Sequence, residues 1–218
     1  MLVLNKPAGM AVHGGSRVSV GCIEALRSLR PRQAELDLVH RLDRDTSGCL
    51  LIAKRRSALR TLHRILREGG MHKRYVALVK GAWRHGSLSL SLALAKQPGA
   101  GGARVQVAES GRPAQSEFRV LQAYGRLATL MEVSIPTGRT HQIRVHAAHL
   151  GHPIGGDTRY GDPKFNARMR ELGLKRMFLH AHTLAFSWPD SDEDFLFSAP
   201  LPEALRDVQD RLEQLSKD

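Results

Sequence analysis

The sequence is short of cysteines, acidic side chains and long apolar runs, and each shortage excludes a class of protein. Its two cysteines, Cys22 and Cys49, are too few for a disulfide framework and have no C-x-x-C spacing, so we expect buried free thiols. No apolar run approaches the ~20 residues that span a bilayer. The N-terminus shows no charged segment followed by an apolar core, as a secretory signal would. We therefore expect a cytoplasmic protein without membrane association.

Acidic residues are outnumbered: 21 Asp and Glu stand against 33 Lys and Arg, which gives a net charge of +12 and a pI near 10.5. A surplus of this size attracts polyanions, of which nucleic acid is the leading candidate. A basic but merely solvated surface is the alternative. Charge alone favours the first interpretation without deciding it.

The periodicity of apolar residues predicts helices and strands that are interleaved without a strict βαβ rhythm. We expect helices over 19–30, 57–68, 143–150 and 164–172 and one from Pro202 onward. We expect strands at 2–4, 50–53, 75–79, 104–108, 116–122, 126–135, 176–188 and 195–198, and a flexible loop at 97–103. This pattern is typical of an α+β fold with a mixed or mostly antiparallel sheet.

The densest group of reactive side chains lies in V-H-R-L-D-R-D-T-S-G-C at 39–49, just before an expected buried strand. Asp43 and Asp45 stand there among Arg41 and Arg44. A neighbouring guanidinium keeps a carboxylate ionised, as a nucleophile or base must be. The alternative is an Asx-type turn with surface ion pairs. These residues alone do not choose between the two aspartates.

A second group follows a predicted turn, in P-T-G-R-T-H-Q-I-R-V-H-A-A-H at 136–149. This set of hydrogen-bond donors suits phosphate or carboxylate recognition and comprises Arg139, His141, Gln142, Arg144 and His146. The histidines at 141, 146, 149 and 152 match no zinc spacing, so we expect no metal there.

A third group is H-K-R-Y-V-A-L-V-K-G at 72–81, where Tyr75 stands on an expected strand beside Lys73 and Arg74. An aromatic ring flanked by cations can stack on a nucleobase. The alternative is an ordinary half-buried tyrosine of a strand.

Taken together, these segments resemble one family. H-R-L-D-R-D-T-S-G at 40–48 closely resembles the signature of the RluA-type pseudouridine synthases. In the order typical of that family, the chain also has N-K-P-A-G at 5–9, K-R-Y-V-A-L-V-K-G at 73–81, G-R-T-H-Q-I-R-V-H at 138–146 and G-H-P-I-G-G-D-T-R-Y-G at 151–161. The matches extend over roughly residues 3–200, and the ordered set is far more specific than any single segment.

The resemblance implies roles for individual residues. Asp43, which follows Arg-Leu, would be the catalytic aspartate, and Arg144 would pair with its carboxylate. Tyr75 would stack on the target base, and Arg41 would enter the RNA when that base leaves. The neighbouring polar residues expected to contact RNA are His40, Arg44, Lys73, Arg139, His141 and Gln142.

The resemblance also implies an architecture. We expect residues 1–218 to be one monomeric catalytic domain, built around a long mixed, mostly antiparallel sheet with flanking helices and a central catalytic cleft. Some relatives carry an RNA-binding domain of the S4 type ahead of this domain. Because the chain opens directly on strand-like Leu2-Val3-Leu4, we expect that such a domain is missing here.

The implied activity is isomerisation of specific uridines to pseudouridine in large-subunit (23S) ribosomal RNA, an intramolecular transfer. The N1–C1′ bond breaks and the uracil reattaches through C5, so nothing is oxidised, no water is consumed, and no cofactor or metal is expected. The base must first leave its stack. Two rival hypotheses are a passive basic RNA-binding protein, which gives Asp43 no task, and a metal-dependent nuclease that uses the histidines.

Overall fold

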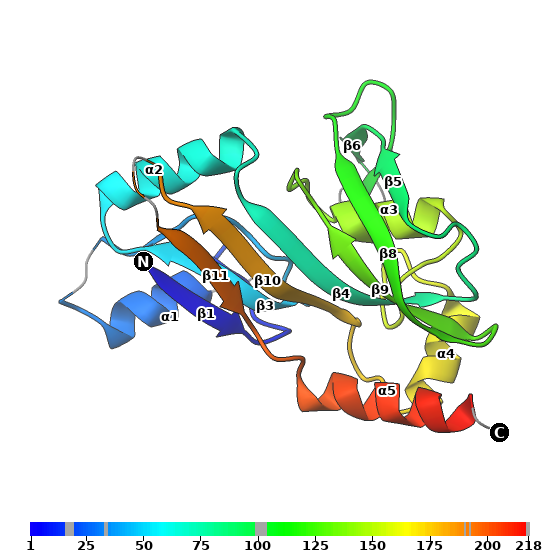
Figure 1. Ribbon diagram of the computed structural model, residues 1–218. Helices are drawn as coiled ribbons and strands as arrows, with labels where there is room; N and C mark the ends of the chain where they lie inside the picture. The colour runs from blue at the N-terminus through cyan, green and yellow to red at the C-terminus, as the bar shows by residue number, and fades with distance from the viewer. Residues whose placement is uncertain (16–19, 33–34, 99–103, 190, 192, 217–218) are drawn as a thin grey trace. The chain divides into compact units, whose positions relative to one another are not determined.

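The computed structural model describes residues 1–15, 20–32, 35–98, 104–189, 191 and 193–216, which form an α+β structure (Figure 1). The helices are α1 (Cys22–Leu29), α2 (Arg56–Arg67), α3 (Gln142–His149), α4 (Pro163–Glu171) and α5 (Glu203–Leu215). The strands are β1 (Leu2–Lys6), β2 (Asp37–Leu38), β3 (Ser47–Ala53), β4 (His72–Lys80), β5 (Leu88–Ser91), β6 (Leu94–Gln97), β7 (Arg104–Val107), β8 (Gln115–Tyr124), β9 (Ala128–Ser134), β10 (Leu179–Ser187) and β11 (Asp194–Ser198). The chain divides into two compact units, one of Met1–Lys73 with His180–Pro200 and one of Arg74–Leu179 with Leu201–Asp218.

The first unit is organised around β3. This strand pairs antiparallel with β1 and β2 and parallel with β10, which in turn pairs antiparallel with β11. All seven residues of β3 are buried, because both of its faces are covered. The single parallel pairing in this unit's described residues makes the sheet mixed.

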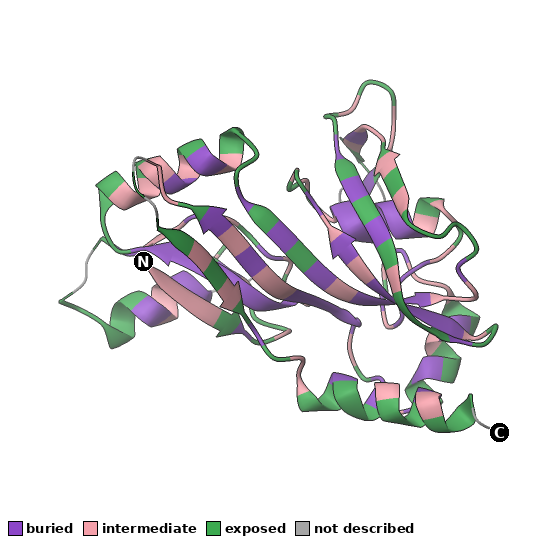
Figure 2. Ribbon diagram, viewed as in Figure 1, coloured by how far each residue is buried: buried purple, intermediate pink, exposed green. Residues whose placement is uncertain are grey.

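The alternation of side chains along β3 separates two hydrophobic clusters. Leu51 packs with Leu62 and Ile65 of α2, whereas Ile52 packs with Ile23 and Leu26 of α1. Since successive strand residues point to opposite faces, α1 and α2 cover opposite sides of this part of the sheet. Their inward-facing residues are buried and their outer residues exposed (Figure 2).

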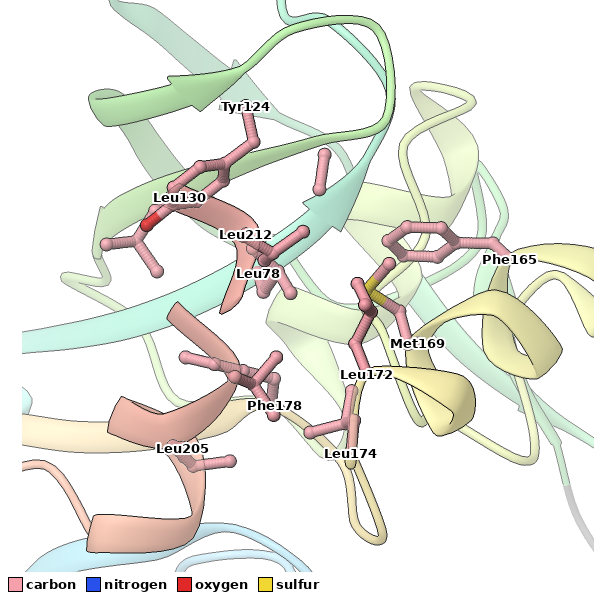
Figure 3. Packing of buried hydrophobic residues seen from close by; sticks show 12 residues of the cluster. Leu78, Tyr124, Leu130, Phe165, Met169, Leu172, Leu174, Phe178, Leu205 and Leu212 are labelled. Carbon is pink, nitrogen blue, oxygen red and sulfur yellow. The ribbon is translucent and has the colours of Figure 1, made fainter. Parts of the chain in front are cut away.

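The second unit has four antiparallel strands in the order β4-β9-β8-β5 and a separate hairpin of β6 and β7. Its main hydrophobic cluster joins the strands to α4 and α5. Figure 3 shows Leu78 of β4 with Phe165 and Met169 of α4 and with Leu205 and Leu212 of α5. Burial of these side chains fixes both helices against the strands that carry them.

The α+β class and the mostly antiparallel pairing are confirmed, as are the expected helices, with shifts of a few residues at their ends. The structure adds β2, β5 and β6, which we had not predicted. Most of the predicted loop at 97–103 lies outside the described residues. Cys22 and Cys49 are buried and free, as expected. No helix in the described part of the chain is long and apolar enough to cross a membrane.

Candidate active site

Asp43 stands at the first position of a tight turn in the first unit. The Asp43 carbonyl accepts a hydrogen bond from the Thr46 amide at 3.2 Å, which closes the turn. The carbonyl of the next residue, Arg44, accepts from the amide of Gly9 at 2.9 Å and from the Lys6 ammonium at 2.9 Å. The N-K-P-A-G segment therefore holds the turn that presents Asp43, although the two are more than thirty residues apart in the chain.

Lys6 is the main support of this turn. Its side chain is fully buried, and its Nζ also donates to the carbonyls of Pro7 and Met10, each at 2.8 Å. An ammonium has three donors, and here it meets three backbone carbonyls. Lys6 lies within the N-K-P-A-G motif, which by itself predicts no role for it. A lysine next to a proline at the end of a strand carries no local sign that it will be buried.

The residues after the turn lock the start of β3 against β10. The His180 Nε2–H donates to the Ala199 carbonyl at 3.0 Å, so His180 Nδ1 accepts from the Ser47 hydroxyl at 2.8 Å. Gly48 has a φ of +112°, and a Cβ there would lie 2.2 Å from the Ala181 carbonyl oxygen. The Ser-Gly of the signature is therefore needed for the close approach of two strands beside Asp43.

His40 takes a structural position in the same segment. Its Nε2 accepts a hydrogen bond from the Leu51 amide at 3.1 Å. Burial, together with the positive charge of Lys73, lowers the pKa of His40 to about 4. The ring is therefore neutral at pH 7. The expectation that His40 contacts RNA stays a prediction.

The remaining polar residues around Asp43 are more accessible. Asp43 is half-buried and Arg41 is exposed. Arg44 and Asp45 form an ion pair at 3.3 Å, with 64% of the Arg44 side chain and 44% of the Asp45 side chain exposed. A pair as exposed as this adds little to stability. The turn thus offers a supported carboxylate with cationic side chains in reach of solvent.

In the second unit, Arg144 of α3 forms a bidentate ion pair with Asp157. Its Nε and Nη2 donate to the two carboxylate oxygens at 2.7 and 2.9 Å, and both side chains are buried. Burial alone would raise the pKa of Asp157. The hydrogen bonds and charge of Arg144, with the amides of Arg159 and Tyr160, instead hold this pKa below its ordinary value. Asp157 is therefore ionised and fixes the plane of the guanidinium.

Sequence reasoning missed Asp157 as a partner of Arg144. Asp157 lies in the Gly-rich run at 151–161, where an aspartate is typical of an Asx turn. In the structure its carboxylate accepts hydrogen bonds from the backbone amides of Arg159 and Tyr160. No local sequence pattern, however, indicates that this aspartate will pair with an arginine thirteen residues earlier in the chain. The predicted pairing of Arg144 with Asp43 stays a prediction, since the two residues belong to different units.

The side-chain amide of Gln142, two residues before Arg144, connects two segments of the second unit by hydrogen bonds. Its Oε1 accepts from Thr137 Oγ1 at 2.8 Å and from the Arg139 amide at 3.0 Å. Its Nε2 donates to the Gln115 carbonyl at 2.7 Å and to Ser116 Oγ at 3.1 Å. These four bonds use both donors and both acceptor positions of the amide. Gln142 thereby joins the turn at 136–139 to β8.

His141 and Arg139 complete the second group. His141 caps the start of α3 in a left-handed conformation, with φ at +55°, and its Nδ1 lies 2.9 Å from the Tyr160 hydroxyl. The Arg139 Nε donates to the Pro113 carbonyl at 3.0 Å. A cavity of about 460 Å³ lies beside Arg139 and is also lined by Lys96 and Arg112. Three cations around one cavity suit a phosphate group.

Tyr75 and Lys73 are both buried on β4, and Arg74 between them is exposed. Tyr75 faces Val133 across the β4–β9 pair. Tyr75 is thus more deeply buried than the half-buried tyrosine of the alternative hypothesis, and base stacking stays a prediction. Among the described residues, no three His, Cys, Asp or Glu side chains are grouped as metal ligands would be.

The comparisons with known proteins place this chain in a family. The model of the RNA pseudouridylate synthase family matches residues 1–149, more than half of the chain. The chain therefore belongs to the RNA pseudouridylate synthase family. Its fold also resembles a solved structure of human RNA pseudouridylate synthase domain containing 1, with a TM-score of 0.73 and 27% identity over 99% of this chain and 90% of that one.

The similar curated proteins carry a more specific name. The chain is 50% identical to ribosomal large subunit pseudouridine synthase C of Haemophilus ducreyi over 213 residues, which cover 97% of this chain and 66% of the relative. It is 52% identical to the protein of the same name from Escherichia coli strain K12 over 209 residues, covering 94% of this chain and 65% of the relative. The chain thus spans slightly less than two thirds of the length of these relatives.

Proposed function

We propose that this chain isomerises specific uridines of large-subunit ribosomal RNA to pseudouridine, with Asp43 as the reacting side chain. The observation that carries the proposal is the turn at 43–46, whose backbone is held by buried Lys6 and by Gly9. A supported but solvent-accessible carboxylate is what a nucleophile or base requires. Family membership and the names of the similar proteins supply the substrate class.

The chemistry explains why one carboxylate suffices. The N1–C1′ bond breaks, the uracil turns, C5 bonds to C1′, and the proton on C5 is released while N1 gains one. Asp43 would attack C1′, attack C6 of the ring, or remove the C2′ proton. Each route needs an ionised oxygen, and none needs a redox cofactor, a metal or a second carboxylate with an admitted water, as glycoside hydrolysis does.

Base flipping precedes this step, because the reacting atoms cannot be reached in a stacked nucleotide. Unstacking costs a few kcal/mol by a rough estimate. We assign Arg41, which is exposed two residues before Asp43, to the gap that the base leaves, and Tyr75 to stacking on the extruded base. A planar guanidinium can replace lost stacking and neutralise phosphate.

Arg41→Ala should therefore lose more activity on a stacked target uridine than on an unstacked one, and equal losses on the two RNAs would refute the role of Arg41 in base flipping.

Arg144 would supply the counter-charge to Asp43 in the working enzyme, and Asp157 would orient it. The protein would act as a monomer in the cytoplasm.

Asp43→Asn tests the proposal directly. With RNA tritiated at uridine C5, wild-type protein should release tritium as C5 loses its proton, and Asp43→Asn should release none while binding RNA with nearly unchanged affinity. Asp45→Asn is the matched control, since it removes the same charge two residues away, and it should be milder. An Asp43→Asn protein that turns over at about a tenth of the wild-type rate would exclude Asp43 as the reacting group. A wild-type protein that binds RNA but releases no tritium would leave the passive RNA-binding hypothesis.

A further inference from the structure

Helix α2 of the first unit carries a row of arginines on its outer face. Arg56, Arg60, Arg64 and Arg67 are all exposed. With 3.6 residues per turn, the four fall within an arc of roughly 80° around the helix axis. Leu62 and Ile65, on the opposite side, are buried. Figure 2 shows buried and exposed residues alternating along this helix. One face of α2 is therefore packed, and the other is a stripe of guanidinium groups, called the α2 arginine row below.

The α2 arginine row is unfavourable for an isolated helix. Like charges three or four residues apart destabilise a helix by about 0.2–0.5 kcal/mol for each pair. The twelve residues of α2 include no Asp or Glu, and the nearest carboxylate along the chain is that of Glu68 at the C-cap, four residues after Arg64. Lys54 and Arg55 add positive charge at the positive end of the helix dipole. An anion from outside the helix would offset these terms.

The geometry of the row suits a chain of phosphates. The helix is about 18 Å long, and arginines four residues apart are separated by about 6 Å along its axis. A guanidinium binds phosphate oxygens in a bidentate manner. The helix has no Phe, Tyr or Trp for stacking on bases, and its one aromatic ring, that of His63, is half-buried. The α2 arginine row would therefore contact the backbone of a nucleic acid, and contacts to phosphates carry no sequence information.

An anionic membrane is the other partner that a basic amphipathic helix can fit, but the packing of α2 argues against it. Such a helix inserts its apolar face into the lipid. The apolar face of α2 is already buried, with Leu62 and Ile65 packed against Leu51 and Met71. Only the charged face is available for a partner.

We propose that the α2 arginine row binds the phosphate backbone of the substrate RNA, in a segment several nucleotides away from the target uridine. This deepens the proposed function and rests on it for the identity of the RNA. For the start of the row the distance follows from the first unit alone: β3 separates the turn of Asp43 from Arg56, and seven strand residues extend about 23 Å. The rest of α2 packs back onto β3, with Leu62 and Ile65 near Leu51. The row would thus contribute affinity for long RNA and take no part in bond breaking.

The test replaces all four arginines with glutamine, which has a helix propensity close to that of arginine. Arg30, Arg32, Arg170 and Arg206, all exposed, replaced by glutamine in a second protein give a matched control with the same net charge. For both proteins and wild type, binding to a long fragment of large-subunit ribosomal RNA and to a short hairpin around one target uridine is measured over a salt series. Tritium release at saturating RNA gives the turnover, and circular dichroism with Tm confirms the fold.

The α2 variant should bind the long RNA at least tenfold more weakly than the control, with a slope of log K against log salt smaller by up to about 3, since each neutralised phosphate contributes about 0.7–0.9. Its binding to the short hairpin and its turnover at saturation should stay at wild-type values. Equal binding of the α2 variant and the control, or a loss of turnover at saturation, would overturn the proposal. So would α2-dependent binding to phosphatidylserine vesicles without α2-dependent binding to RNA. If wild-type protein releases no tritium, the proposed activity fails, but the binding comparison still decides whether α2 contacts RNA.

Discussion

At the scale of single residues, the side chains that would do chemistry depend on buried partners that do none. Lys6 holds the turn of Asp43, and Asp157 fixes the plane of Arg144. Sequence motifs pointed to the candidate reactive residues because Asp, Arg and Tyr in dense polar segments are conspicuous. They left the partners without roles, since burial and hydrogen bonding are decided by segments far away in the chain. The same holds for Gln142, a polar residue in a motif whose amide is engaged inside the protein.

Lys6→Met should destabilise the protein strongly. The substitution keeps an unbranched chain of similar size but leaves the carbonyls of Pro7, Met10 and Arg44 without their ammonium donor. A hydrogen bond to a charged group contributes about 1.5–3 kcal/mol, and water can replace part of this at the three carbonyls, because their residues are exposed. We expect a loss of about 3–5 kcal/mol in the free energy of unfolding, measured by urea titration. Exposed Lys54→Met should change it by less than about 0.5 kcal/mol. Similar losses in both variants would show that the three bonds of Lys6 contribute little.

His40 should make stability depend on pH below neutrality. Its pKa is about 4 in the folded protein and near 6.5 when unfolded. Between these values the unfolded chain binds the additional proton, so the contribution is fully present above pH 6.5 and is lost as pH falls toward 4. The loss amounts to at most about 3 kcal/mol, at 1.36 kcal/mol per pKa unit. His40→Gln, which keeps an acceptor for Leu51, should lose less stability than wild type between pH 7 and pH 4.5. Parallel curves for the two proteins would contradict the lowered pKa.

At the scale of elements, the sequence predicted helices and strands well wherever a periodic pattern of apolar residues, or a Gly or Pro that ends it, lay within the element itself. The helix at 56–67 and the strands at 72–80 and 128–134 appeared within a few residues of their predicted ends. Strand β5 was missed although Leu-Ser-Leu-Ser alternates as a strand should. Strand β2 has only two residues, too few for any period to show. The parallel pairing of β10 with β3 could not be predicted, since it joins segments more than 130 residues apart.

Gly48→Ala should disrupt that parallel pairing. An added Cβ would lie 2.2 Å from the Ala181 carbonyl oxygen, and backbone at both ends leaves no flexible side chain to move. Gly86 is the matched control, because it also has a positive φ, +62°, but nothing within 4 Å of an added Cβ. Gly86→Ala should cost about 1 kcal/mol of backbone strain. Gly48→Ala should cost several times more by thermal or urea unfolding, or prevent folding. Equal effects of the two substitutions would mean that φ, and not the close approach of β10, explains this glycine.

At the scale of the whole molecule, the dominant property is the net charge of +12, which neither the ion pairs nor the hydrophobic clusters explain. A net charge does not determine the fold, so we expect it to act on the association of the protein with charged partners. The signature residues around Asp43 and Arg144 and the α2 arginine row all contribute to it. The composition predicts a polyanionic partner, and the ordered motifs independently predict a family that acts on RNA. The two inferences agree, because RNA is a polyanion.

Binding of ribosomal RNA should therefore weaken steeply with salt. If about five phosphates are neutralised, log K falls by about 4 for each tenfold rise in salt, so affinity should drop at least a hundredfold between about 50 and 200 mM. The effect arises because each contact releases a condensed counterion, whose return is favoured as salt rises. Fluorescence anisotropy with a labelled RNA over a potassium chloride series measures the slope. Urea titrations at the same salt concentrations serve as the control, because the folded state should keep its stability while affinity falls. Affinity that stays flat across this range would mean that the positive charge serves a partner other than nucleic acid.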